Sequence, residues 1–422
     1  MAVTGLVVTI GSAPGGDARD VAALTRALTA AGISPVGHFA AEDDEAAVDE
    51  ALALAADVTV VVAGAGNSSG DAVRRTVARV AGVRLVLNDR MLAALEEGYR
   101  RRDRPLPRRA ERLALLPQGA VAWLSPDTDP AWMLEAGGRV FAVLPRGADV
   151  EAIVARHLAP FLAARATPAD AVHTRTLRAA GVSPGDVEER LAEWVGRFGE
   201  ADGTAVTVLP GAGDAEVWVR IVSRGPGGAE TLAAVERRIA DALGQDCYGR
   251  DDETLERVVG RLLSERGLTL SVAESCTGGL LGHRLTEIPG SSAYFERGFL
   301  VYSNRAKQDL LGVPESILRA HGAVSAPCAE AMARGVCAAS GNPVGIAVTG
   351  IAGPDGGSPQ KPVGTVFIGV AVAGDVQVRR FGFGGDRSSV KWQSTQMALD
   401  MLRRKLQRWS PEPPSGSSSP SR

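Results

Sequence analysis

Residues 268–285 read LTLSVAESCTGGLLGHRL and predict a strand, a tight glycine turn and a helix in direct succession. LTLSVA is an apolar run of strand length, and the helical pattern begins after Gly279. Three side chains that can act as nucleophiles lie between the two elements: Ser275, Cys276 and Thr277. The turn therefore places reactive oxygen and sulfur atoms beside unusually accessible backbone.

Strands also alternate with helices in the rest of the chain. From residue 1 to about 160, GLVVTI, DVTVVVAG and RVFAVLP alternate with helical patterns, which indicates a doubly wound, mostly parallel sheet. Residues 165–250 contain two helical patterns and a strand pair, which predict a small α+β module. Residues 251–408 alternate again and end in a hairpin, which is typical of an α/β/α sandwich. We predict an α/β chain with domains at 1–162, 165–250 and 251–408, and a disordered tail at 409–422.

Composition limits the possible partners and compartments. The net charge is -3, with 46 basic and 49 acidic residues mixed along the chain, so we expect no nucleic-acid partner and no anionic membrane surface. The four cysteines have spacings that match neither a disulfide framework nor a zinc site, which indicates reduced thiols in the cytoplasm. No apolar run approaches the roughly 18–20 residues of a membrane span. A small molecule is the expected partner.

Four polar clusters follow predicted strands of the third domain. They are AESCTGG, YSNRAK, TGIAGPDGG and GGDR. Because open α/β sheets bind ligands beyond the carboxyl ends of their strands, we expect these clusters to converge on one site. No cluster resembles a metal site or a Walker loop, so we expect neither a metal nor a cofactor.

A serine nucleophile at residue 275 requires a base. The histidines of this domain, His283 and His321, are not near a strand end, which argues against a Ser-His-Asp triad. Lys307 falls in the first turn of a predicted helix, where the helix dipole disfavours its ammonium. To act as a base near pH 7, its pKa must fall by roughly 3 units, or about 4 kcal/mol, so burial must contribute. Tyr302, at the preceding strand end, could relay a proton or hydrogen-bond the serine oxygen.

The remaining candidates are predicted to contact the substrate. Free N–H groups at the helix start can hold an oxyanion, and Arg387 at another helix start can clamp an anion. The glycine-rich loop that follows a strand is suited to backbone contact with a ligand. The full set of predicted contacts is Cys276, Thr277, Gly278, Gly279, Thr349, Gly350, Gly353 and Arg387.

Each candidate also has a simpler interpretation. Ser275 or Thr277 could only cap the helix, Lys307 could be a solvated surface lysine, and Tyr302 could be a core aromatic. Arg387 could pair with a neighbouring carboxylate such as that of Asp386.

Taken together, AESCTGG, SSAYFERGFLVYSNRAK, GAVSAPCAEAMA, TGIAGPDGG, KPVGTV and GDR resemble the carboxyl-terminal domain of the CinA family, the competence/damage-inducible proteins. That domain is similar to stand-alone bacterial nicotinamide-nucleotide amidases, and the match covers about residues 250–407. The resemblance implies a homodimer that hydrolyses nicotinamide mononucleotide to nicotinate mononucleotide and ammonia without a metal.

The same resemblance assigns roles to individual residues. It makes Ser275 the nucleophile, Lys307 the base and Tyr302 the assisting hydroxyl, with Thr349 and Arg387 as substrate contacts. Cys276 remains an alternative nucleophile that the sequence alone does not exclude.

The amino-terminal segment resembles the family's first domain, which is similar to molybdopterin-binding domains and is associated with ADP-ribose pyrophosphatase activity in some members. The middle module resembles the family's KH-related linker but lacks the G-x-x-G loop of RNA-binding KH domains. In the first domain, Ser12 and Ala13 replace the acids of the family's first loop, and AGAGNSSGD retains only Asp71 of a later acidic pair.

A metal-dependent hydrolase needs several oxygen ligands, so we predict that the first domain is degenerate and catalytically inactive. The alternatives to the amidase are an ADP-ribose pyrophosphatase and a non-enzymatic scaffold linked to competence or DNA damage.

Overall fold

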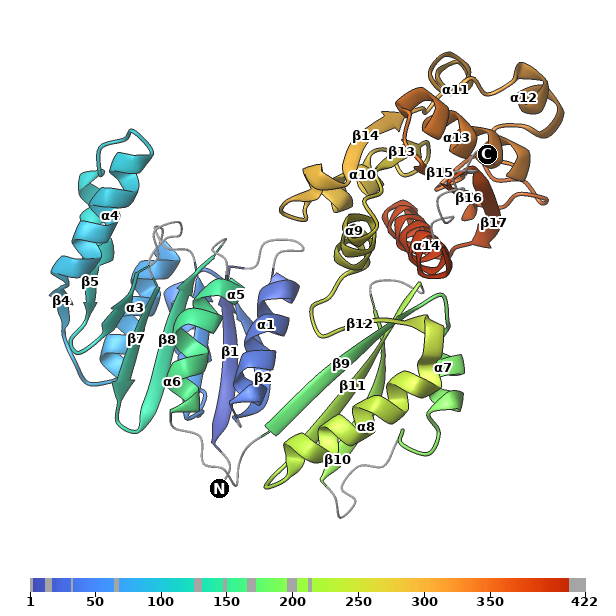
Figure 1. The fold of residues 1–422 in the computed structure, drawn as a ribbon. Helices are drawn as coiled ribbons and strands as arrows, with labels where there is room; N and C mark the ends of the chain where they lie inside the picture. Colours follow the sequence, from blue (N-terminus) through green and yellow to red (C-terminus); the bar gives the residue numbers. More distant parts are fainter. Residues whose placement is uncertain are drawn as a thin grey trace, which may run out of the picture. The chain divides into compact units, whose positions relative to one another are not determined.

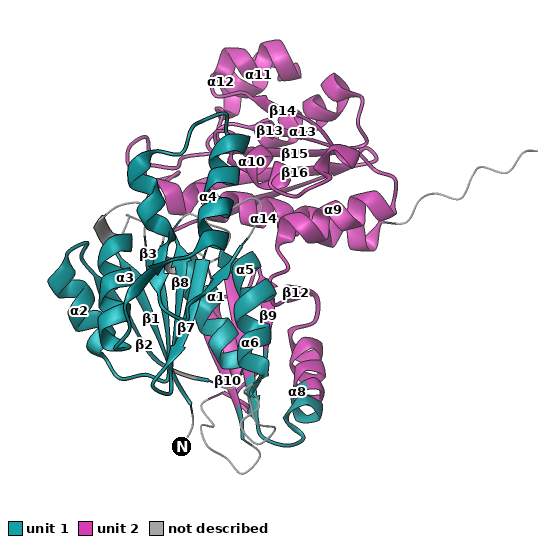
Figure 2. Cartoon of the chain, turned by 90° about the vertical axis from the view of Figure 1, so that its left-hand side faces the viewer, with its two compact units in different colours: residues 1–174, 201–204, 222–232 teal, residues 175–200, 205–221, 233–422 magenta. Residues whose placement is uncertain are grey.

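The computed structural model describes residues 3–11, 17–31, 33–63, 68–124, 131–146, 150–164, 172–195, 203–211 and 215–409. Figure 2 shows its two compact units. Unit 1 comprises residues 1–174, 201–204 and 222–232, and unit 2 comprises residues 175–200, 205–221 and 233–422. Strands and helices alternate in both units (Figure 1), which confirms the predicted α/β fold class. The predicted tail lies outside the described residues, except for Trp409.

Unit 1 is built on a six-stranded sheet of order β2-β1-β3-β8-β7-β6. The first four strands in this order are parallel and the last two are antiparallel. Continuous apolar runs fill the central strands, because helices cover both faces of the sheet. The strands are β1 (Thr4–Ile10), β2 (Ser34–Ala41), β3 (Val58–Ala63), β6 (Val121–Trp123), β7 (Ala131–Ala136) and β8 (Arg139–Pro145).

Two helical layers bury the faces of this sheet. One contains α2 (Glu45–Ala53) and α3 (Ser68–Val80). The other contains α1 (Asp17–Ala30) and the carboxyl-terminal turns from α5 (Val150–Ile153) to α6 (Ala159–Ala163). Each layer contributes an apolar stripe to a separate core cluster, so the sheet has a core on both sides.

A helical hairpin stands out from the sheet of unit 1 (Figure 1). It consists of α4 (Asp89–Arg101) and the short 3-10 helix η1 (Arg108–Ala114). The antiparallel ribbon of β4 (Leu85–Leu87) and β5 (Leu115–Pro117) closes its base. The sequence patterns did not predict this hairpin.

The predicted middle module contains more strands than expected. Its sheet has the order β10-β11-β9-β12 and carries α7 (Pro184–Arg190) and α8 (Gly228–Leu243). The predicted strand pair is present, but the predicted helix over 183–198 ends at Arg190. The strands are β9 (Val172–Ala180), β10 (Thr204–Pro210), β11 (Glu216–Arg224) and β12 (Cys247–Arg250).

β9 is missing from the sequence prediction because its sequence, VHTRTLRAA, is largely polar. Its arginines have charged partners: Arg175 Nε lies 3.0 Å from Glu236 Oε2, and Arg178 Nη1 lies 3.5 Å from Glu216 Oε1. These ion pairs allow charged side chains in β9, although it is an internal strand between β11 and β12.

The carboxyl-terminal part of unit 2 is an α/β/α sandwich around a sheet of order β14-β13-β15-β16-β17. β13 is parallel to β14 and β15, and the hairpin of β16 and β17 completes the sheet with antiparallel pairing. The strands are β13 (Leu270–Glu274), β14 (Phe295–Leu300), β15 (Val344–Gly350), β16 (Thr365–Val372) and β17 (Asp375–Gly382).

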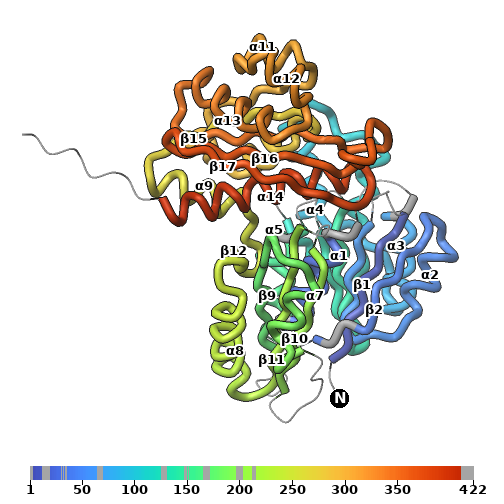
Figure 3. Tube along the Cα trace, turned by 90° about the vertical axis from the view of Figure 1, so that its right-hand side faces the viewer, coloured from blue at the N-terminus to red at the C-terminus, as the bar shows by residue number. Residues whose placement is uncertain are grey.

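Helices cover both faces of this sheet. In Figure 3, α13 lies on one side of the strands, and α9 and α14 lie on the other. The helices are α9 (Leu255–Glu265), α10 (Leu280–Thr286), α11 (Asn304–Leu311), α12 (Glu315–His321), α13 (Ala326–Ser340) and α14 (Arg387–Arg408). No helix in the described parts of either unit combines the length and apolar character that a membrane span requires.

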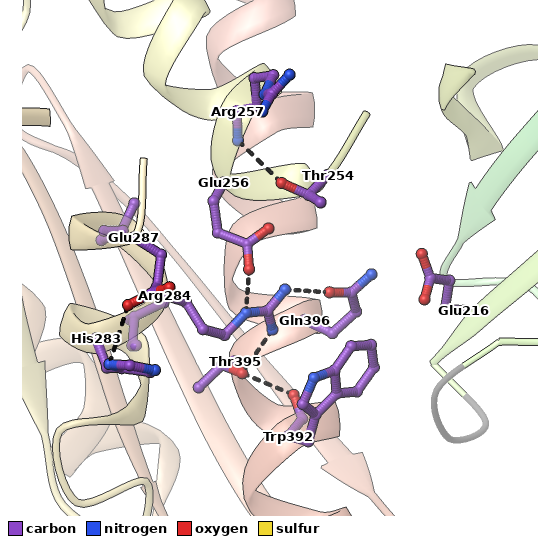
Figure 4. Close-up of polar contacts among 12 residues, drawn as sticks. Glu216, Thr254, Glu256, Arg257, His283, Arg284, Glu287, Trp392, Thr395 and Gln396 are labelled. Atoms are coloured by element: carbon purple, nitrogen blue, oxygen red, sulfur yellow. Dashed lines mark hydrogen bonds and ion pairs between the residues drawn. The ribbon is translucent and has the colours of Figure 1, made fainter. Parts of the chain in front are cut away.

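A buried arginine joins three of these helices (Figure 4). Arg284 of α10 donates from Nη1 to Thr395 Oγ1 at 2.7 Å and from Nη2 to Gln396 Oε1 at 2.6 Å, both on α14. Its Nε pairs with Glu256 of α9, and its guanidinium lies 4.9 Å from the centre of the Trp392 ring. The network holds α10, which follows the Ser275 turn, against the helix that begins with Arg387.

Candidate active site

The predicted site clusters converge at one edge of the sheet in unit 2. Beyond the carboxyl ends of β13 and β15 lies a cavity of about 260 Å³. This is a switch point of the sheet, because the chain continues from β13 to β14 on one side and later returns to β15 on the other. The lining residues are Ser275, Cys276, Tyr302, Lys307, Ala323, Val324, Thr349, Gly350, Ile351, Ala352, Gly353, Asp355, Gly356 and Arg387.

Ser275 and Lys307 are in direct contact. Lys307 Nζ lies 3.0 Å from Ser275 Oγ, and the two side chains are almost completely buried. Nζ also donates to the backbone carbonyls of Val301 at 2.7 Å and Tyr302 at 3.4 Å. Lys307 has only 1% exposure, so it is not the solvated surface lysine of the simpler interpretation.

Burial shifts the protonation equilibrium of Lys307 toward its neutral form. Burial lowers the pKa of its ammonium, and no carboxylate pairs with it in the described parts of unit 2. A neutral amine has two N–H donors and one lone pair, and two carbonyls are in position to accept from the donors. The lone pair can then accept the proton of Ser275 Oγ, which is what a general base for this hydroxyl must do.

Cys276 is less suited than Ser275 to act as the nucleophile. Burial raises the pKa of its thiol to about 12, so the thiol is protonated near pH 7. Since the thiolate is the nucleophilic form of cysteine, this environment favours the serine.

The start of α10 is already neutralised by a carboxylate of the chain. Glu274 Oε2 accepts from the amides of Gly279 and Leu281, both at 3.0 Å, and Oε1 accepts from Gly282 at 2.8 Å. Glu274 therefore acts as the cap of this helix, and neither Ser275 nor Thr277 does. Because the Gly279 amide donates to Glu274, it is not available to bind an oxyanion. The backbone amides that remain as predicted oxyanion donors are those of residues 276–278.

The two glycines of the turn are required by its backbone. Gly278 has φ +63° and Gly279 has φ +95°, in the left-handed region that side chains with a Cβ disfavour. The turn can therefore reverse directly from β13 into α10 while Ser275 stays at the cavity wall.

Thr349 and Arg387 reach the same cavity from different elements. Thr349 Oγ1 donates to the Ala323 carbonyl at 2.9 Å, so the described contacts already use this hydroxyl. Arg387 Nη1 donates to the Gly353 carbonyl at 2.7 Å. Asp386 instead accepts from Ser389 as the cap of α14, so the simpler pairing of Arg387 with Asp386 is not observed.

Of the other predicted contacts, Gly350 and Gly353 line the cavity, whereas Thr277, Gly278 and Gly279 are not among its lining residues. Gly350 packs tightly, since a Cβ there would lie 2.6 Å from Val366. The side chain of Tyr302 is 65% exposed, and its contact with Lys307 is made by the backbone carbonyl. No hydrogen bond joins the Tyr302 hydroxyl to Ser275 or Lys307, all three of which are among the described residues.

Sequence reasoning missed two charged residues beside the turn. Glu274 belongs to the quoted AESCTGG cluster but received no role, because it ends β13 six positions before the helix start at Leu280, outside the usual capping position. Lys391 of α14 lies over Gly278, where its Nζ would be 3.5 Å from an added Cβ. Nothing in the sequence pattern indicates this second contact.

The chain is similar to known proteins along most of its length. A family model described as the CinA C-terminal domain matches residues 252–406, and one described as a probable molybdopterin binding domain matches residues 16–215. A putative competence-damage inducible protein of Moorella thermoacetica is 41% identical over 395 residues, 92% of this chain and 94% of that protein. This chain belongs to the CinA family.

A second relative gives the same assignment and confirms the resemblance seen in the sequence. A CinA-like protein of Geobacter sulfurreducens is 36% identical over 395 residues, again 92% of this chain and 94% of the relative. Among solved structures, the competence/damage inducible protein CihA of Agrobacterium tumefaciens is 44% identical and covers 36% of this chain and 94% of that one, with a TM-score of 0.36.

The CinA-type first domain of this chain does not fit a metal centre where the structure describes it. Asp71, the retained acid, pairs with Arg74 and lies 3.1 Å from Arg112 Nε. The carboxylate of Asp71 is thus paired with two guanidinium groups and is not available as a ligand for a metal cation. The described residues contain no group of three or more His, Cys, Asp or Glu able to hold a metal ion. Ser12 and Ala13 lie outside the described residues.

We expect Glu274→Gln to loosen the start of α10. The substitution keeps the size of the side chain but removes the charge that accepts three amide N–H groups, which should cost about 1.5–3 kcal/mol locally. Hydrogen exchange followed by mass spectrometry should show amides 279–286 exchanging roughly 10- to 100-fold faster. Unchanged exchange would show that the carboxylate does not hold this turn.

We expect no hydrolysis of ADP-ribose by the wild-type protein with Mn²⁺ or Mg²⁺, because Asp71 is neutralised by Arg74 and Arg112. Chromatography of the nucleotide products measures this directly. Metal-dependent turnover that is lost in Asp71→Ala would contradict the expectation and identify a working pyrophosphatase site.

Proposed function

We propose that this CinA family member is a serine–lysine amidase that hydrolyses the carboxamide of nicotinamide mononucleotide, giving nicotinate mononucleotide and ammonia. The observation that supports the reaction type is the buried contact between Lys307 Nζ and Ser275 Oγ at 3.0 Å. The choice of substrate rests on the resemblance of AESCTGG, YSNRAK and TGIAGPDGG to the nicotinamide-nucleotide amidases.

In the first step, neutral Lys307 accepts the proton of Ser275 Oγ as that oxygen attacks the amide carbon. The carbonyl oxygen becomes an anion, which we expect the backbone amides of residues 276–278 to hold; of these three residues, Cys276 lines the cavity. Glu274 contributes by fixing the turn that presents these amides, since it accepts from the amides of Gly279, Leu281 and Gly282.

In the second step, the Lys307 ammonium returns its proton to the departing nitrogen, and the C–N bond breaks. Ammonia leaves and an ester with Ser275 remains. Water then attacks the ester carbon while Lys307 again accepts a proton, and the serine leaves with that proton. The net reaction consumes one water and requires no redox partner.

The nucleotide would be positioned by groups that line the rest of the cavity. Arg387 is a planar cation suited to phosphate, and its contact with the Gly353 carbonyl fixes the guanidinium beside the glycine-rich loop. The exposed ring of Tyr302 lies at the same cavity and offers an apolar face to the pyridine. We therefore assign Tyr302 a contact with the substrate ring in addition to the predicted role of its hydroxyl.

We expect ammonia release from nicotinamide mononucleotide to continue in the presence of a chelator and in the Cys276→Ala variant. Ser275→Ala should lower kcat/KM by at least about 10³-fold, because it removes the attacking oxygen. Lys307→Met and Lys307→Arg should be similarly inactive, since neither side chain can accept a proton near pH 7. A coupled ammonia assay measures all five samples.

Two outcomes of this assay would contradict the proposal. Loss of turnover in Cys276→Ala with full activity in Ser275→Ala would make the thiol the nucleophile. No turnover by the folded wild-type protein would remove the amidase assignment and favour the scaffold alternative.

The pH dependence provides an independent check on Lys307. Burial lowers the pKa of this lysine, and only its neutral form can act as the base. The value of kcat/KM should therefore rise with pH as Lys307 loses its proton, with the midpoint of this limb below the ordinary lysine value of about 10.4. A limb centred at or above that value would show that the amine is not depressed in the active enzyme.

A further inference from the structure

Unit 1 concentrates positive charge on the hairpin of α4 and η1. Residues 100–112, RRRDRPLPRRAER, are called the arginine arm below. The arm contains seven arginines and two acidic residues, Asp103 and Glu111, so its net charge is +5. The net charge of the whole chain is -3. The other residues therefore sum to -8. The positive charge is local, and the overall balance conceals it.

All seven arginines of the arm are exposed. Four have partners within unit 1. Arg100 and Arg101 pair with Glu97, Arg112 lies 3.1 Å from Asp71, and Arg102 lies 5.8 Å from the centre of the Tyr99 ring.

The other three arginines are Arg104, Arg108 and Arg109. Their side chains have no ion pair, hydrogen bond or ring contact with any described residue of unit 1. They lie within six positions of one another: Arg104 is on the link from α4 to η1, and Arg108 and Arg109 begin η1. The three guanidinium groups that have no partner in the described part of unit 1 are therefore close together in sequence, at the end of the hairpin where α4 turns into η1.

The chemistry of this group is selective. Every cation of the arm is arginine, whose planar guanidinium can donate two parallel hydrogen bonds to a phosphate. Pro105 and Pro107 fix the backbone between the three free arginines, which lowers the entropy lost when they are held by a partner. A ligand with several regularly spaced phosphates would engage them together.

We propose that the arginine arm binds the phosphate backbone of a nucleic-acid duplex. The expectation of no nucleic-acid partner followed from the overall charge, and the local charge of the arm argues against it. The arm contains no aromatic residue, so it offers no ring for base stacking. It should therefore bind through phosphates without reading sequence.

Two other partners fit the arm less well. Leu106, the sole apolar side chain between the free arginines apart from the prolines, packs against the core of unit 1, so the tip has no side chain to insert into a membrane. The second is another copy of this chain, which could offer the acidic residues of α2 to the arm. Two of these acids already form ion pairs within their own unit: Glu45 pairs with Arg75, and Asp49 pairs with Arg79.

The test uses the full chain and fluorescein-labelled DNA and RNA duplexes, with anisotropy measured between about 50 and 200 mM NaCl. Binding should weaken steeply with salt, and the slope of log K against log salt should be about -0.9 for each phosphate contacted. The triple variant Arg104→Gln, Arg108→Gln, Arg109→Gln should weaken binding at least about tenfold and reduce the slope by about 2.7.

A matched control removes the same charge elsewhere. Arg224, Arg237 and Arg257 are exposed, and no described residue pairs with their side chains. The triple variant Arg224→Gln, Arg237→Gln, Arg257→Gln should bind the duplexes nearly as well as the wild type. Thermal melting of both triple variants shows that they remain folded, and ammonia release reports on the amidase site separately.

Binding of either duplex through the arm supports the proposal, and the tighter of the two identifies the nucleic acid. Three results would overturn it: no binding of either duplex at the lowest salt, equal loss of binding in both triple variants, and binding of anionic phospholipid vesicles without binding of a duplex.

Discussion

A buried lysine amine with which no described carboxylate pairs is the constraint around which the candidate site of unit 2 is arranged. An ammonium at 1% exposure would be costly to bury, and the described residues around it provide only carbonyl and hydroxyl oxygens to compensate it. The carbonyls of Val301 and Tyr302 are available because β14 ends at Leu300 and α11 begins at Asn304. The gap between strand and helix thus supplies the two carbonyls that accept from the buried amine.

The charged side chains around Ser275 are held apart, because each has its own hydrogen-bond partners. Glu274 is adjacent in sequence to Ser275, yet its oxygens face the amides of α10 and do not pair with Lys307. If that carboxylate were free to reach the amine, it would stabilise the ammonium and raise its pKa. The Arg284 network then fixes α10 against α14, so the turn and Arg387 are held by the same helix packing.

Two kinds of feature could be predicted from the sequence: strands that are buried along their whole length, and residues whose place at the end of a strand follows from the order of strands and helices. The strands at 5–10, 344–350 and 365–372 are largely apolar and almost entirely buried. The residues that follow strands could be assigned to one edge of the sheet from the predicted topology alone. β9 was missed because ion pairs replace apolar contacts along it. The role of Glu274 was missed because a sequence does not show whether an acid at a strand end faces solvent or a helix start. The arginine arm was overlooked because a net charge averages over the whole chain.

The protonated thiol of Cys276 affects how the site withstands oxidation. Peroxides and alkylating agents react with the thiolate, and burial holds this cysteine in its unreactive form beside the reacting oxygen. A serine nucleophile with a lysine base has no comparable sensitivity. The proposed serine–lysine hydrolysis would therefore persist during oxidative stress that inactivates enzymes with a cysteine nucleophile.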